Sequence, residues 1–145
     1  MDNTNITPIS LGIRKKSFAI DGDEGRVIYL DPSDMGILAR LETFGNQIEP
    51  TLSKLKDVTA EQFGSVITEV DKELRDEVNA VFDYDVCSIC VPSGTMVDVI
   101  DGKFKFEIVV NALADVYTNT ISDEMKKVTA RMAEHTKKYT GIKRV

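Results

Sequence analysis

The stretch Thr59–Tyr84, TAEQFGSVITEVDKELRDEVNAVFDY, decides how the rest of the chain must fold. Its apolar residues recur at spacings of three and four, which places them on one face of an α-helix. These residues are Phe63, Val66, Ile67, Val70, Leu74, Val78, Val81 and Phe82. Thr59 and Gln62 have the spacing of a capping box, which predicts that the helix begins at Thr59. So wide an apolar face needs other elements to cover it.

The opposite face of this helix is charged, which predicts that it is exposed to solvent. Its charged residues are Glu69, Asp71, Lys72, Glu73, Arg75, Asp76 and Glu77. Asp71 precedes Arg75, and Lys72 precedes Asp76, by four residues. At that spacing opposite charges are neighbours on a helix surface, so both pairs are expected to form.

Length and composition indicate one folded domain without a membrane span. The chain has 145 residues, of which 42% are hydrophobic, and no apolar run approaches the roughly 20 residues that cross a bilayer. The sequence begins MDNTNITPIS, which lacks the basic start and the apolar core of a signal peptide. Its two cysteines suit a reducing compartment. We therefore expect a cytoplasmic protein.

Charge is distributed unevenly along the chain. The net charge is -6, which argues against non-specific binding to nucleic acid. Residues 123–145 carry seven Lys/Arg and three Asp/Glu, a net charge of +4. The remainder carries 11 Lys/Arg and 21 Asp/Glu, a net charge of -10. A basic tail on an acidic body indicates either a binding arm or a solubilising segment.

The residues before the central helix predict a hairpin and a helix. Residues 16–31 hold two β-rich runs around the loop Asp21–Gly25, as in a hairpin. We expect it to pack over helices or to pair with residues near 96–100. A helix is expected near residues 33–48, because a capping sequence precedes an apolar stripe and Pro50 ends or kinks it.

The residues after the central helix predict two more helices. Residues 86–91 form a short apolar run that is either a strand or a buried helical turn. Asp101-Gly102 predicts either a tight hairpin turn or a loop end. Helical spacing predicts a helix near residues 104–121, and Ser122 followed by two acidic residues predicts the start of another at 122–140.

The expected fold is α+β, predominantly helical, with about four helices and an amino-terminal β-hairpin or small antiparallel sheet. We expect a loose lead-in at residues 1–15, a globular domain at 16–121, and a basic amphipathic helix and tail at 122–145. Six residues of the apolar faces are predicted to be buried. They are Val70, Leu74, Phe82, Phe106, Val110 and Leu113.

Cys87 and Cys90 form the one motif of chemical interest, a C-x-x-C pair. A redox pair of this kind needs its first thiolate stabilised at a helix amino terminus. Here the pair follows a helix end, and the neighbouring Asp83 and Asp85 would raise a thiol pKa. We interpret both as buried structural thiols.

No other residues specify catalysis or a cofactor. A zinc site needs four ligands, and this chain offers the two cysteines and the single histidine, His135. The loop Asp21–Gly25 lacks the ligand spacing of an EF-hand, because Gly25 and Pro32 stand at ligand positions. We therefore predict no catalytic, cofactor or metal residues, and a protein that is not an enzyme.

A diffuse sequence pattern resembles the tail assembly chaperones of long-tailed, non-contractile bacteriophages and prophages of Gram-positive bacteria. It covers roughly residues 16–120. The matching segments are 18–22, 27–34, 70–78, 81–83, 86–87, 92–96 and 101–107. The pattern includes no catalytic signature.

The resemblance implies a function in phage tail assembly. Such chaperones are small, acidic, mostly helical cytoplasmic proteins that bind the tape measure protein, keep its long hydrophobic helices soluble and recruit tail tube subunits. They are absent from the mature virion, and many also exist in a longer form made by translational frameshifting. The implied partners are the tape measure and tail tube proteins of the same phage, with homo-oligomers possible and neither nucleic acid nor membrane expected.

Two other functions compete with this one. One is a minor structural tail protein or head–tail joining protein that stays in the virion. The other is a thiol oxidoreductase that uses Cys87 and Cys90, which the environment of the motif disfavours.

The carboxy-terminal stripe is the candidate partner-binding site. Its residues follow the alternating three–four spacing of a coiled-coil seam. They are Met125, Val128, Met132, His135 and Tyr139. A helix that docks on its own domain usually has a wider apolar face, so we expect this stripe to bind a partner. Packing on the domain's own core and self-association through the same seam are the alternatives.

Overall fold

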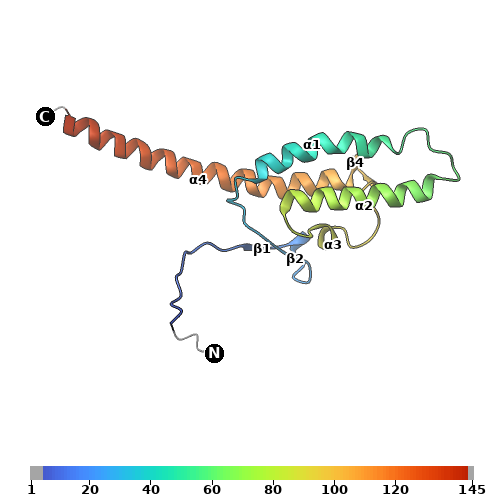
Figure 1. Cartoon of the computed structure of the whole chain (residues 1–145), viewed down its shortest axis with the longest axis horizontal. Helices are drawn as coiled ribbons and strands as arrows, with labels where there is room; N and C mark the ends of the chain where they lie inside the picture. The colour runs from blue at the N-terminus through green and yellow to red at the C-terminus, as the bar shows by residue number, and fades with distance from the viewer. Residues whose placement is uncertain (1–4, 144–145) are drawn as a thin grey trace.

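The protein is a mainly helical α+β domain, as predicted (Figure 1). The computed structural model describes residues 5–143, with side chains through residue 134. Within that part the elements are β1 (Lys16–Ala19), the 3-10 turn η1 (Ile20–Gly22), β2 (Val27–Leu30), α1 (Ile37–Ser53), α2 (Phe63–Phe82), α3 (Cys87–Cys90), β3 (Val99–Ile100), β4 (Lys103–Phe104) and α4 (Lys105–Lys143).

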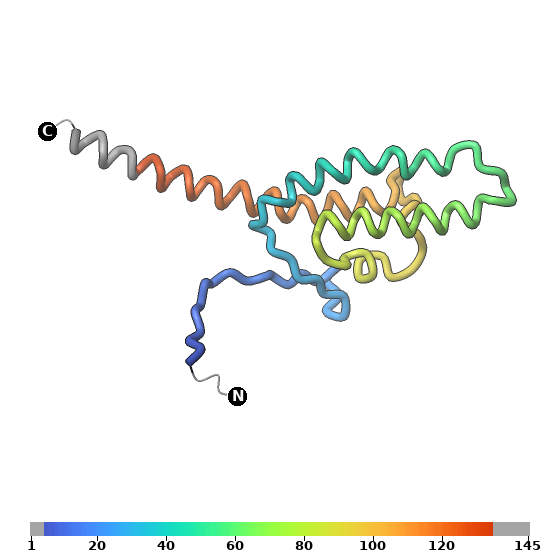
Figure 2. Tube along the Cα trace, viewed as in Figure 1, coloured from blue at the N-terminus to red at the C-terminus, as the bar shows by residue number. Residues whose placement is uncertain are grey.

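Three helices build the core. α1 and α2 form an antiparallel hairpin that lies along the first half of α4 (Figures 1 and 2). All six residues predicted to be buried are at most 7% exposed, so the predicted core is confirmed. Aromatic contacts join α4 to both helices: the rings of Phe44 and Phe106 lie 6.2 Å apart, and those of Phe82 and Tyr117 lie 5.9 Å apart.

The predicted amino-terminal hairpin is confirmed, and it packs on the helices. β1 pairs antiparallel with β2. Ile28 and Leu30 are buried in the core while Tyr29 is 51% exposed, the alternation expected of a strand with one covered face. Pairing with residues near 96–100 does not occur, because β3 pairs with β4 instead. Asp101 and Gly102 both have positive φ in that tight turn, the geometry for which Asp-Gly is favoured.

The predicted start of the central helix at Thr59 is wrong. α2 begins at Phe63, and its N-cap residue, Gln62, makes no side-chain capping hydrogen bond. Residues 59–62 form an isolated turn in which Gln62 N–H donates to the Thr59 carbonyl. These residues are exposed at the far end of the α1–α2 hairpin. A capping sequence without a core to pack against does not extend the helix.

α1 is shifted and longer than predicted, because it runs through Pro50 to Ser53. Pro50 removes one intrahelical hydrogen bond and usually ends a helix. Here the next residue, Thr51, is buried, and its hydroxyl lies 2.5 Å from a carboxylate oxygen of Glu77 on α2. Leu52 and Leu55 also pack against the core. Packing on α2 therefore offsets the lost bond.

The two helices predicted at residues 104–121 and 122–140 are one continuous helix, α4, which begins at Lys105. Ser122 does not cap a new helix. No glycine or proline occurs between Gly102 and Gly141, so nothing forces the backbone out of helical geometry there. A break would lose backbone hydrogen bonds that a single cap does not replace. The fourth described helix is α3, where the apolar run around Cys87 forms a helical turn.

Substitution of Leu74 by alanine is predicted to lower the free energy of unfolding by about 2–5 kcal/mol. Leu74 is fully buried on α2, so its removal loses transfer energy and leaves a cavity. Urea unfolding followed by circular dichroism measures the loss. The control is Lys72→Ala on the exposed face of α2, for which a change within about 0.5 kcal/mol is expected. A similarly small loss for Leu74→Ala would contradict the predicted core.

Candidate functional site: the free part of α4

The second half of α4 projects beyond the domain (Figure 2). Every described residue from 122 to 134 is exposed. Met125, Val128 and Met132 are 47%, 38% and 56% exposed, although they are large apolar side chains. The alternative in which this helix packs on its own core is therefore wrong for residues 122–134. The side chains of His135 and Tyr139 lie outside the described residues.

The exposed stripe continues the face by which α4 packs into the core. Along the first half of the helix, that face is covered by the α1–α2 hairpin. It is formed by Phe106, Val109, Val110, Leu113, Tyr117 and the partly buried Ile121. Met125, Val128 and Met132 follow Ile121 at spacings of four, three and four. One apolar stripe thus runs along α4, covered over its first half and open over residues 122–134.

The arm before β1 is a second exposed apolar segment, which the sequence reasoning treated as a loose lead-in. Ile6, Ile9, Leu11 and Ile13 are between 72% and 82% exposed. Their recurrence among polar residues is the sequence signal that could have singled out this segment. The arm leaves β1 and runs away from the domain (Figure 1). The end of the arm that joins β1, residues 12–16, passes close to α4.

A cavity of about 380 Å³ separates the arm from α4. One wall is formed by Gly12, Ile13, Arg14 and Lys16, and the opposite wall by Thr120 and Glu124. The turn after β2 closes the cavity between them. Glu124 precedes Val128 of the open stripe by four residues, so these two side chains are neighbours on the helix surface. The cavity therefore adjoins the free stripe of α4.

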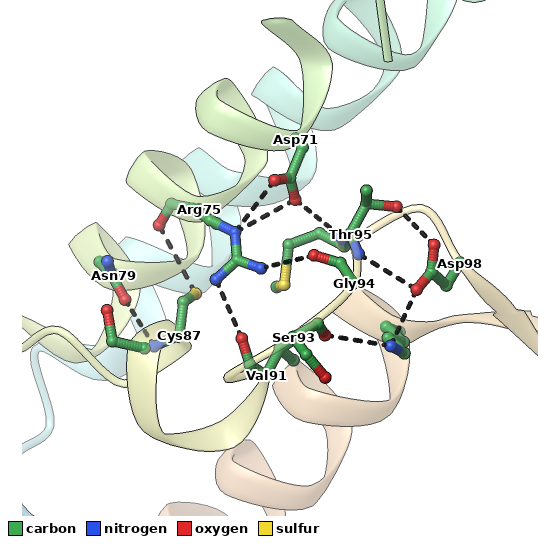
Figure 3. A network of polar contacts seen from close by, with 12 residues as sticks. Asp71, Arg75, Asn79, Cys87, Val91, Ser93, Gly94, Thr95 and Asp98 are labelled. Carbon is green, nitrogen blue, oxygen red and sulfur yellow. Dashed lines mark hydrogen bonds and ion pairs between the residues drawn. The ribbon is translucent and has the colours of Figure 1, made fainter. Parts of the chain in front are cut away.

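Arg75 holds the loop that follows α3, the helical turn that contains the two cysteines (Figure 3). Its guanidinium donates to the carbonyls of Val91 and Gly94, both at 3.2 Å, and pairs with Asp71 at 3.1 Å. Asp71 in turn accepts a hydrogen bond of 2.7 Å from the Met96 N–H. The predicted Asp71–Arg75 and Lys72–Asp76 pairs both exist. The sequence did not indicate that the first pair anchors a distant loop instead of facing water.

The surroundings of the cysteines disfavour thiol chemistry. Both thiols are free, Cys87 is buried, and Cys90 is partly buried. Burial raises the pKa of Cys87 to about 12 and also raises the pKa of Cys90. The sulfur of Cys87 lies 3.7 Å from the Arg75 carbonyl, which accepts its S–H. A reactive thiol needs the opposite shift, toward the thiolate.

Asp98 organises the start of α4. Its carboxylate accepts hydrogen bonds from the Thr95 hydroxyl and N–H and pairs with Lys105 at 2.8 Å. These contacts lower the pKa of Asp98, the Lys105 ammonium having the largest effect. Among the side chains that the structure describes, no three His, Cys, Asp or Glu are grouped as a metal site would require.

Comparisons of the chain with protein-family models, with curated proteins and with solved structures found no match. Within the described residues, no helix has both the length and the apolar character needed to cross a membrane. The candidate site therefore rests on the geometry of α4 and the arm.

Cys87 is predicted to react slowly with N-ethylmaleimide in the native protein. Its raised pKa leaves a thiolate population roughly a thousandfold below that of an ordinary cysteine, and its side chain is covered. Mass spectrometry of a labelling time course measures the rate, with the urea-unfolded protein as the control. Rapid native labelling of Cys87 would contradict this assignment. The assignment of both cysteines as structural thiols would also be contradicted if a double variant, Cys87→Ala with Cys90→Ala, folded normally but lost chaperone activity.

Substitution of Arg75 by methionine is predicted to lower the free energy of unfolding by about 1–3 kcal/mol. The change removes the donors for two loop carbonyls and the partner of Asp71. Arg75→Lys is expected to restore less than half of the loss, because one ammonium cannot reproduce the planar fork. Urea unfolding measures both variants, with Lys72→Met as the exposed control. Full stability of Arg75→Met would show that the loop is held by packing alone.

Proposed function

We propose that this protein is a phage tail assembly chaperone that binds the tape measure protein through the free part of α4. The observation that carries the proposal is the apolar stripe that leaves the core and stays open at Met125, Val128 and Met132. The sequence resemblance to tail assembly chaperones supplies the identity of the client.

The open stripe suits a helical client. Over its first half the same stripe is covered by the helices α1 and α2, so its spacing already fits helix packing. The resemblance implies a tape measure protein as the client, with long hydrophobic helices. A projecting helix can lie along such a helix without requiring the domain to open.

Two features of the stripe favour binding at many positions along a client. Met125 and Met132 have flexible, polarizable side chains that adapt to different neighbours. The stripe is also narrow and simple in pattern, so it selects for an apolar helix face more than for a particular sequence. A chaperone that coats a long protein needs this kind of tolerance.

The charge of the domain supports a solubilising role. Residues 17–122 carry eight Lys/Arg and 20 Asp/Glu, a net charge of -12. A client bound along α4 would be surrounded by strongly acidic domains, whose mutual repulsion keeps the complex in solution. The same acidic surface is available to recruit tail tube subunits.

Co-expression with the tape measure protein tests the proposal. Met125→Asp together with Met132→Asp places two charges in the stripe and is predicted to reduce the soluble, co-purifying tape measure protein at least about tenfold. The matched control is Ala130→Asp with Ala133→Asp, which adds the same charge to exposed positions away from the stripe. The control is expected to behave as the wild type.

Two results would contradict the proposal. If the stripe variant still solubilises the tape measure protein, α4 is not the client surface. If the protein is found in purified virions, it is a minor structural tail protein or head–tail joining protein. Circular dichroism and thermal melting of both variants verify that the domain stays folded, as expected from the exposure of the substituted residues.

A further inference from the structure

The amino-terminal arm presents apolar side chains that its own domain does not cover. Four large aliphatic residues lie within residues 5–13, and each is at least 72% exposed. Three basic residues, Arg14, Lys15 and Lys16, follow them, and residues 5–16 contain no acidic residue. Exposed apolar residues beside a block of one charge are typical of a surface that a partner covers.

The arm and the free part of α4 face the same space. The cavity of about 380 Å³ has Ile13 and Arg14 on the arm side and Thr120 and Glu124 on the helix side. The open stripe of α4 begins at Met125, one residue after Glu124. A helix lying on that stripe would therefore run past the end of the arm that joins β1, residues 12–16. Of the exposed apolar arm residues, Ile13 lines the cavity and is therefore the one nearest to such a helix.

The charges around this space define the chemistry of its occupant. The arm contributes three cationic groups, whereas residues 123–134 of α4 carry three Lys/Arg and three Asp/Glu, so the net positive charge around this space comes from the arm. On α4 itself, Lys127 and Arg131 lie on the side of the stripe that faces the cavity, where Glu124 pairs with Lys127 at 3.3 Å. The surface thus favours a helix with an apolar face and acidic residues along its borders.

Two surfaces of a second copy of this chain, the acidic side of α2 and the free part of α4, do not offer such a helix among the described residues. The acidic side of α2, with Glu69, Glu73 and Asp76, has no large apolar residue exposed along it except Phe63 at its very start. The exposed apolar stripe of α4 is bordered by basic residues. Neither surface combines an open apolar stripe with acidic borders.

We infer that the amino-terminal arm, residues 5–16, and the free part of α4, residues 122–134, are two walls of one binding channel for an amphipathic helix with acidic borders. This inference rests on the proposed function, which it extends by adding the arm to the client surface and by stating the charge of the client. The arm then folds against the bound helix, which closes the side that α4 leaves open.

The experiment uses two synthetic peptides of about four heptads with leucine at the a and d positions. One has glutamate at e and g, and the other has lysine there. The full-length protein is titrated with each fluorescently labelled peptide by anisotropy. The arm variant is Ile9→Asp with Leu11→Asp, and its matched control, Thr7→Asp with Ser10→Asp, adds the same charge to polar arm positions. Hydrogen exchange of residues 5–16 is followed with and without peptide.

The inference predicts that the glutamate peptide binds at least about tenfold more tightly than the lysine peptide. The arm variant should lose at least about tenfold in affinity, while its control should stay within about twofold. Amide exchange in the arm should slow on binding, because the arm becomes ordered against the peptide.

Several results would overturn the inference: no binding of the glutamate peptide, equal binding of both peptides, an arm variant that binds as the wild type, or unchanged exchange in the arm. It is also overturned if light scattering shows a dimer that the arm variant abolishes, since a second copy is then the occupant. The proposed function is decided separately by the co-expression assay. The arm variant is added to that assay. If the α4 variant loses the tape measure protein and the arm variant retains it, the proposed function stands without the arm. If both variants retain it, both proposals are wrong.

Discussion

The packing of α4 against the α1–α2 hairpin is the interaction on which the rest of the structure depends. It buries Phe106, Leu113 and Tyr117 against Phe44 and Phe82, and so unites the first and last thirds of the chain in one core. The hairpin is shorter than α4, so it covers only the first half of the apolar stripe. The open stripe is thus a direct consequence of how much of α4 the domain can bury.

The position of α4 is fixed at its beginning by the loop that Arg75 anchors. Arg75 and Asp71 hold the loop on α2 at Val91, Gly94 and Met96. The loop then meets the first turn of α4, where the Phe106 N–H donates to the Met96 carbonyl at 3.0 Å. A charged pair on one helix therefore helps to position another helix that is distant in sequence. The cysteines lie in α3, just before this loop, where burial leaves them as packing residues.

Local patterns in the sequence predicted the helical class, the hairpin and the buried faces, because periodicity records which side of an element is covered. They failed at helix boundaries. The capping residues at Thr59 and Ser122 are real local signals, but the first has no core beside it and the second lies in a stretch that nothing interrupts. At Pro50 the local signal predicted an end or a kink, and contacts of Thr51 with α2 kept the helix intact. The errors at Thr59 and Pro50 arose where tertiary contacts, or their absence, outweighed a local preference. The error at Ser122 arose because the backbone hydrogen bonds of an uninterrupted helix outweigh a single cap.

The sequence by itself determined that α2 has one buried face, that the chain is an acidic body with basic ends, and that Met125, Val128 and Met132 share one stripe. These properties follow from residue order and helix geometry alone. Only the tertiary structure decided that this stripe is left uncovered, that the arm approaches α4 across a cavity, and that Arg75 is an anchor. The part of the stripe that is covered depends on how far the α1–α2 hairpin extends along α4. That length depends on where helices end in space, which local residue patterns do not record.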